Sequence, residues 1–228
     1  MTDPKIIVAI DTFDFEKANA ILEQLNPDLC LVKIGSVVFN ALGKSFLKHA
    51  SSQGFKIFLD LKLHDIPNTV HETITGFNDC KIDMLTVHLS GGEEMIRKAM
   101  LAGKSINTKV IGVSILTSLE EEDSLTLFGN KLEDQISNLF KVAVKLNIDG
   151  IVCSPDELEI ANTMLGSHSI KITPGIRDIK VEDDQARTMS AKEAIEKGST
   201  FLVIGRPITQ AEDISIALQD FNSSLNEK

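Results

Sequence analysis

Short apolar stretches rich in Val, Ile and Leu recur along the whole chain. The eight stretches are IIVAI (6–10), LCLVKIG (29–35), KIFLDLK (56–62), MLTVHL (84–89), VIGVSIL (110–116), GIVCS (150–154), IKITPG (170–175) and FLVIGR (201–206). Their apolar positions are continuous rather than alternating, which is typical of strands covered on both faces, as in a parallel sheet. The pattern therefore predicts eight parallel strands.

The segments between these stretches carry the spacing of amphipathic helices. In 15–25 and in 132–146, apolar residues recur every three or four positions and the opposite face is polar. Eight strand–helix units in 228 residues leave roughly 28 residues each, which is enough for a βα repeat. We therefore expect an eight-stranded (β/α)8 TIM barrel, with a doubly wound open sheet as the alternative.

The acidic run 120–123 is typical of a solvated face.

The composition excludes some classes of binding partner and indicates the cellular compartment to expect. The chain carries 23 Lys and Arg against 33 Asp and Glu, a net charge of −10 that repels nucleic acid. An anionic ligand would need cations gathered locally. Its three cysteines stand singly, which suggests neither disulfides nor a zinc site. With no signal peptide, membrane span or linker evident, we expect one cytoplasmic domain over residues 1–228 that does not bind membranes.

Polar residues gather where the predicted strands end, which is where a barrel of this kind carries its active site. They are Asp11, Lys33, Asp60, Lys62, Asp65, His88, Ser90, Thr117, Ser154, Pro174, Gly175, Arg177, Gly205 and Arg206. Nearly every strand contributes to this set, so the sequence predicts a polar site at the carboxyl end of the barrel.

Asp60 and Lys62 form the strongest chemical signal. Two residues apart on a strand, they point to the same face, and opposite charges buried there are costly unless they are hydrogen-bonded. A purely structural core would prefer Val or Ile at these positions, so a function is the better explanation. The alternative is a buried ion pair that fixes the barrel's register. Lys33 on the neighbouring strand would complete a Lys–Asp–Lys array, although it could instead extend to the barrel mouth. The direction of Asp65 cannot be fixed from spacing.

The loops after the last two predicted strands suggest a phosphate site. Gly175 and Gly205 would let the backbone approach a ligand closely, while Arg177 and Arg206 supply positive charge. These loops form the usual phosphate pocket of a TIM barrel. The alternative is a pair of turn glycines beside surface arginines.

His88 is interpreted as an interior histidine rather than a catalytic base or a metal ligand. His64 and His71 complete no HxH or HExxH pattern with it. We therefore expect no metal.

The run DLKLHDIPNT (60–69) resembles the orotidine 5′-phosphate decarboxylase family, whose signature is DLKxHDIPNT. The other family segments follow in order along the chain: Asp11, Lys33, VHLSGG (87–92), LTS (116–118), VCSPDE (152–157), TPGIR (173–177), DDQ (183–185) and VIGRPIT (203–209). The resemblance implies cofactor-independent conversion of orotidine 5′-monophosphate to UMP and CO2 in pyrimidine biosynthesis.

The resemblance also implies residue roles. Lys62 would protonate C6 of the pyrimidine, within a charge array that includes Lys33, Asp60 and Asp65. The expected substrate contacts are Asp11 and Thr69 to ribose, Thr117 to the pyrimidine, Gln185, Gly205 and Arg206 to phosphate with Arg177 nearby, and in addition Ile66 and Pro174. Asp65 and Thr69 would reach into the partner's site of a homodimer, and 176–187 would close over the phosphate.

Two alternatives remain open. The sugar-phosphate enzymes 3-keto-L-gulonate 6-phosphate decarboxylase and hexulose-phosphate synthase also carry DxKxxD, but they use magnesium and have an acidic residue where Lys33 stands. The second alternative is a catalytically silent barrel that only binds a nucleotide. Asp60 argues against it, because a binding protein has no need for a buried acid placed against an anionic ligand.

Overall fold

A closed ring of eight parallel strands forms the centre of the computed structural model, which describes residues 4–166, 168–176 and 189–225. The strands are β1 (Ile6–Ile10), β2 (Cys30–Gly35), β3 (Ile57–Leu63), β4 (Met84–His88), β5 (Lys109–Val113), β6 (Gly150–Val152), β7 (Ile170–Thr173) and β8 (Phe201–Ile204). Each strand pairs with the next, and β8 pairs with β1. The predicted TIM barrel is confirmed, and the open sheet is excluded because the ring closes.

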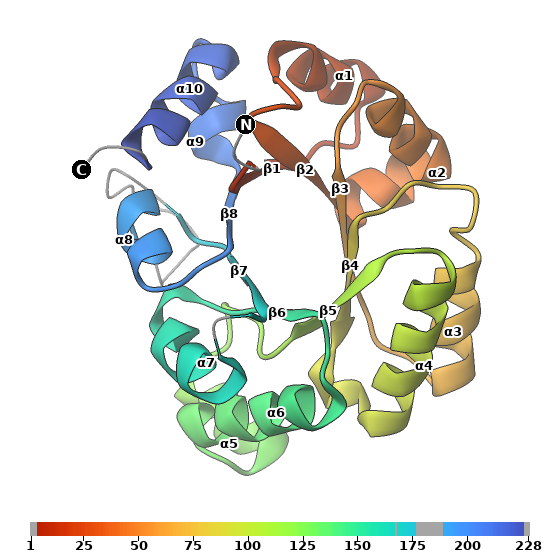
Figure 1. Cartoon of the computed structure of the whole chain (residues 1–228), viewed down its shortest axis with the longest axis vertical. Helices are drawn as coiled ribbons and strands as arrows, with labels where there is room; N and C mark the ends of the chain where they lie inside the picture. Colours follow the sequence, from red (N-terminus) through yellow and green to blue (C-terminus); the bar gives the residue numbers. More distant parts are fainter. Residues whose placement is uncertain (1–3, 167, 177–188, 226–228) are drawn as a thin grey trace.

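Helices surround the ring on its outside (Figure 1). They are α1 (Phe15–Gln24), α2 (Ser36–Ser52), α3 (Pro67–Thr75), α4 (Glu93–Ser105), α5 (Glu121–Phe128), α6 (Leu132–Leu146), α7 (Leu158–Leu165), α8 (Ala191–Glu196), α9 (Arg206–Thr209) and α10 (Ile214–Ser224), with short 3₁₀ turns η1 (Leu89–Gly91) and η2 (Pro155–Glu157). The two predicted apolar stripes lie on α1 and α6. Throughout the described part of the chain, no helix combines the length and apolar character needed to cross a membrane.

The barrel interior is apolar only toward the beginning of its strands. Its buried apolar side chains are Ile7, Leu31, Phe58, Met84, Ile111 and Ile172. Because alternate strand residues share a face, the inward positions that follow Leu31 and Phe58 belong to Lys33 and Asp60. The packed interior therefore gives way to charged side chains at the carboxyl end.

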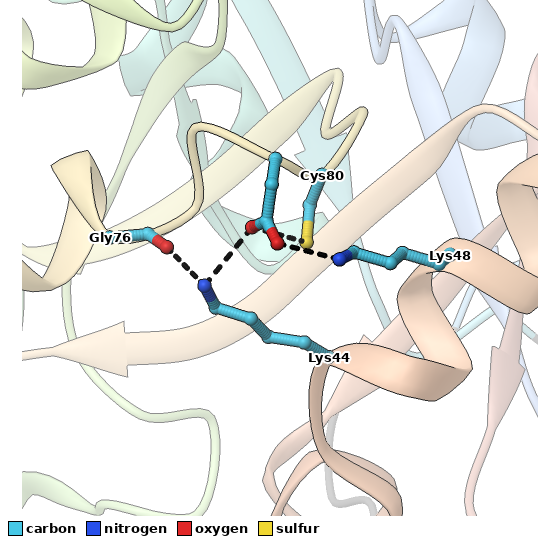
Figure 2. Close-up of polar contacts among 5 residues, drawn as sticks. Lys44, Lys48, Gly76 and Cys80 are labelled. Carbon is cyan, nitrogen blue, oxygen red and sulfur yellow. Dashed lines mark hydrogen bonds and ion pairs between the residues drawn. The ribbon is translucent and has the colours of Figure 1, made fainter.

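On the outside, a cluster of ionic contacts fastens α2 to the segment after α3 (Figure 2). The Asp79 carboxylate accepts hydrogen bonds from Lys48 Nζ at 2.6 Å and from Lys44 Nζ at 3.1 Å. Lys44 Nζ also donates to the Gly76 carbonyl, and the Cys80 thiol donates to Asp79. The bonds from Lys48 and Lys44 hold the pKa of Asp79 well below its usual range. We call these five residues the α2–α3 clamp.

Candidate active site

An irregularity in β3 places Lys62 at the carboxyl-end mouth. The pairing register of β3 with β4 shifts between Leu59 and Leu63, and Lys62 has φ +50°, a left-handed conformation that few non-glycine residues adopt. Its ammonium lies 2.8 Å from Asp60 Oδ2. The predicted Asp60–Lys62 pair is therefore present. It forms where β3 departs locally from regular strand geometry, and not through the strict alternation of a regular strand.

Thr86, on β4, connects the two charged residues. Its hydroxyl oxygen accepts a hydrogen bond from the Lys62 backbone N–H at 2.8 Å, and the hydroxyl donates to Asp60 Oδ1 at 3.0 Å. Thr86 is fully buried. The sequence reasoning missed this residue, although a polar side chain at an inward position of an apolar strand, midway between Met84 and His88, was a usable signal.

Lys33, on β2, contributes a second ion pair at the same mouth. Its ammonium lies 3.3 Å from Asp11 Oδ1, just past β1, and its side chain is only 13% exposed. Asp60 is similarly enclosed, with 11% of its side chain exposed. Among the described residues, the charges are therefore arranged as two ion pairs, Lys33–Asp11 and Lys62–Asp60. Most of the Lys33 side chain is buried, whereas its partner Asp11 is exposed.

Three predicted site residues, in the loop after β3 and the first turn of α3, present their side chains to solvent. Asp65, Ile66 and Thr69 are all exposed, Ile66 at 67%. The Asp65 carboxylate accepts the N–H of Ile66 at 2.7 Å, and within the described residues it makes no ion pair. Within the described part of one chain, these three predicted site residues thus make no hydrogen bond or ion pair with Lys62 or Asp60.

The loops after β7 and β8 hold the predicted phosphate residues that the structure describes. Gly175 has φ +78°, a conformation that favours glycine, and follows the half-buried Pro174. A Cβ built on Gly205 would meet only Ala9, at 3.6 Å, so a ligand could approach this backbone closely. Arg206 is exposed and begins α9.

Other predicted positions are placed less fully. Thr117 is half-buried in the loop after β5. Arg177, Gln185 and almost all of the predicted closing segment 176–187 lie outside the described residues. Ile176 and Met189, the described residues that flank positions 177–188, form an isolated parallel bridge.

His88 ends β4 beside the Lys62–Asp60 pair. Its ring centroid lies 5.3 Å from that of His64. Burial, and then the neighbouring His64 and Lys62, lower the pKa of His88 from its ordinary value, which favours the neutral imidazole. In residues 4–166, 168–176 and 189–225, no group of three His, Cys, Asp or Glu side chains is arranged to hold a metal ion.

A cavity of about 860 Å³ opens at the opposite end of the barrel. Its lining includes Pro4, just before β1, and the first residues of three strands, Met84, Lys109 and Phe201. TIM-barrel enzymes carry their active sites at the carboxyl ends of the strands. The paired charges, rather than this cavity, therefore mark the candidate active site.

The barrel and its paired charges define a TIM-barrel enzyme with a charged site at the carboxyl-end mouth. Residues 4–221 match the model of the Orotidine 5′-phosphate decarboxylase / HUMPS family. The chain belongs to this family, which confirms the resemblance found in the sequence.

Named relatives match the chain over nearly its whole length. Orotidine 5′-phosphate decarboxylase of Actinobacillus succinogenes is 41% identical over 229 residues, covering 98% of each chain. The protein of the same name from Pseudoalteromonas translucida is 41% identical over 226 residues, covering 97% of each. A crystal structure of orotidine 5′-phosphate decarboxylase from Lactobacillus acidophilus superimposes with a TM-score of 0.86 at 35% identity, covering 99% of this chain and 100% of that one.

Proposed function

We propose that this chain decarboxylates orotidine 5′-monophosphate to UMP and CO2 in pyrimidine biosynthesis, without a cofactor. The observation that carries the proposal is the Lys62–Asp60 pair, 2.8 Å apart at the barrel mouth and connected by the buried Thr86. The two relatives of that name, each 41% identical, support the same substrate. We also propose that residues 1–228 act as one domain.

The proposed chemistry needs both members of this pair. When the bond between C6 and the carboxylate breaks, its electron pair stays on C6 and CO2 leaves. The Lys62 ammonium stabilises this carbanion and gives it a proton, forming UMP and leaving a neutral amine. Asp60, beside the substrate carboxylate, raises the energy of the bound substrate relative to the state in which CO2 has separated.

We assign substrate binding to the residues that the family resemblance indicates. Asp11 and Thr69 contact the ribose, Thr117 the pyrimidine, and Gly205 and Arg206 the phosphate. The remaining proposed contacts are Ile66, Pro174, Arg177 and Gln185. Phosphate binding far from C6 supplies energy that orders the charged site around the reacting atoms.

We propose a homodimer with shared sites, because Asp65, Ile66 and Thr69 are exposed and the Asp65 carboxylate joins neither ion pair of the described residues. Two-fold symmetry would bring this loop to the partner's site in both directions. All three cysteines are free, which suits a reducing cytoplasm.

The magnesium-dependent sugar-phosphate enzymes are the main alternative, since the family model includes them. The Lys33 ammonium, 3.3 Å from Asp11, favours the nucleotide reaction, because it would repel a divalent cation at this mouth. Decarboxylation that is unchanged by EDTA is the expected result. A strict need for magnesium would point to the alternative.

Lys62→Ala tests the mechanism directly. We expect the loss of orotidylate absorbance to slow by at least about 10³-fold, since both charge stabilisation and proton transfer are removed. UMP binding, measured by calorimetry, should change much less. Lys141→Ala, on the exposed face of α6, is the matched control and should keep wild-type rates. Near-normal turnover of Lys62→Ala would refute the mechanism, and wild-type protein that binds UMP without turnover would indicate a silent binder.

A further inference from the structure

Gly35 ends β2 and caps α2, two residues after Lys33. Its backbone, with φ −92° and ψ −176°, is extended and open to any residue. The local conformation therefore does not require glycine at this position, and the reason for the missing side chain must lie in its surroundings.

Those surroundings are the charged groups of the candidate active site. A Cβ built on Gly35 would lie 3.0 Å from Lys33 Nζ, 3.6 Å from Asp11 Oδ1 and 4.0 Å from the Asp60 carbonyl oxygen. The first distance is shorter than a relaxed contact between heavy atoms, which is about 3.5–4.0 Å. The Lys33 ammonium thus occupies space that any side chain at position 35 would contest.

Strand geometry explains why these two residues meet. Residues i and i+2 of a strand share a face, so the Lys33 side chain extends past Gly35 before its ammonium reaches Asp11. The group that a methyl would press against is the free end of a flexible side chain, which moves at small cost. A methyl at position 35 would therefore displace the ammonium while leaving the fold intact.

We propose that Gly35 is a positioning residue, which keeps clear the space that holds the Lys33 ammonium against Asp11. The proposal rests on the proposed function for its effect on turnover, but not for its effect on geometry. Gly35 itself contributes no group to the substrate and acts through Lys33.

A double-mutant cycle of Gly35→Ala and Lys33→Ala tests this coupling. Gly35→Ala alone should lower kcat/KM for decarboxylation by roughly tenfold, mostly through kcat, because the ammonium must yield by a few tenths of an ångström and a displacement of about 1 Å can cost 10²-fold. In the Lys33→Ala background, the same change should cost less than about twofold, because the displaced group is gone. Gly76→Ala is the matched control: its Cβ would meet the backbone oxygens of Glu72 and Thr73 at 3.2 Å, a crowded contact that lies in the α2–α3 clamp rather than at the charged site, so kcat should be unchanged.

Crystal structures of the wild type and Gly35→Ala provide a readout that does not depend on turnover. The 3.3 Å contact between Lys33 Nζ and Asp11 Oδ1 should lengthen in the variant, with the β2 backbone unmoved. If the wild type proves inactive on orotidylate, the proposed function fails and this contact still tests the positioning role.

Three results would overturn the proposal. They are an unchanged kcat/KM in Gly35→Ala, an equal loss in both Lys33 backgrounds, and an ammonium that stays in place. A Gly35→Ala protein that does not fold would overturn it as well, because the methyl would then be meeting backbone rather than the ammonium.

Discussion

At the scale of the residue, a single buried hydroxyl fixes the relation between the two charges at the mouth. The Thr86 hydroxyl accepts a hydrogen bond from the Lys62 backbone N–H and donates one to the Asp60 carboxylate. It therefore positions a backbone group and a carboxylate at once. Lys62 has φ +50°, a conformation that persists only where the surrounding contacts enforce it. Thr86 is one of those contacts.

We expect Thr86→Val, which keeps the shape and removes the hydroxyl, to lower the free energy of unfolding by about 1–3 kcal/mol, because two partly buried polar groups lose their partner. Decarboxylation should slow by at least about tenfold, since Thr86 no longer holds the Lys62 backbone or the Asp60 carboxylate that pairs with the ammonium. Thr86→Ser is the control and should keep most of both. Denaturant unfolding and initial rates measure the two effects, and a fully active Thr86→Val would show that Lys62 needs no such support.

Sequence alone identified most of the charged residues but not how they are held. Asp60 and Lys62 were recognisable because charged residues are costly to bury in an otherwise apolar strand, so their presence there indicates a function. The register shift beside Lys62 leaves no mark in the residue pattern, so it could not be predicted. Thr86 was overlooked because threonine is also an ordinary strand residue.

At the scale of the element, the α2–α3 clamp fastens two neighbouring units of the barrel from outside. Asp79 interacts with two lysines of α2, and those bonds hold its pKa well below the ordinary value of an aspartate side chain. A carboxyl group whose pKa is lowered by folding adds stability above its unfolded pKa and loses that contribution as the pH falls.

Asp79→Asn should therefore lower Tm at pH 7 in low salt. The difference from wild type should shrink as the pH falls below about 4, because the unfolded wild-type chain then takes up a proton on Asp79 while the folded chain keeps this carboxylate charged. It should also shrink in 1 M NaCl, where the Debye length is only about 3 Å. Asp220→Asn, on the exposed face of α10, is the control and should melt like wild type. A Tm difference that is insensitive to pH would mean that the clamp does not act through charge.

The elements themselves were largely predictable. Continuous apolar runs revealed the strands, because both faces of each strand are covered. Helix α5 was not predicted, since an acidic run indicates a solvated face. In the structure, Glu120 and Asp123 form a capping box at its start, so the acidic residues begin a helix. The clamp was also missed, because its lysines and Asp79 lie far apart in the sequence.

At the scale of the whole molecule, the proposed dimer makes each site depend on two chains. Asp65 and Thr69 are exposed in one chain, whereas Lys62 and Asp60 lie at its own mouth. Under two-fold symmetry, a chain lacking Lys62 and a chain lacking Asp65 can together form one intact site.

We therefore expect Lys62→Ala and Asp65→Ala proteins, each nearly inactive, to regain activity when mixed and allowed to exchange subunits. Each heterodimer should approach about half the wild-type rate if its two sites work independently. Mixing Lys62→Ala with the double variant Lys62→Ala/Asp65→Ala is the control and should recover nothing. Mass-tagged chains verify the exchange, and no recovery after it would mean that Asp65 serves its own barrel.

Ring closure also dictates the order in which a newly made chain can become active. The pairing of Ile6 in β1 with Leu202 in β8 joins residues from nearly opposite ends of the sequence. On the ribosome, a chain that has not yet exposed Phe201–Ile204 has an open sheet with unpaired edges at β1 and β7, and such edges invite association with other chains. Closing them is a non-local and therefore slow step of folding. Gly205 and Arg206 directly follow the closing strand β8. The step that pairs the open sheet edges, and so protects the new chain from association through them, therefore also brings these proposed phosphate contacts into place.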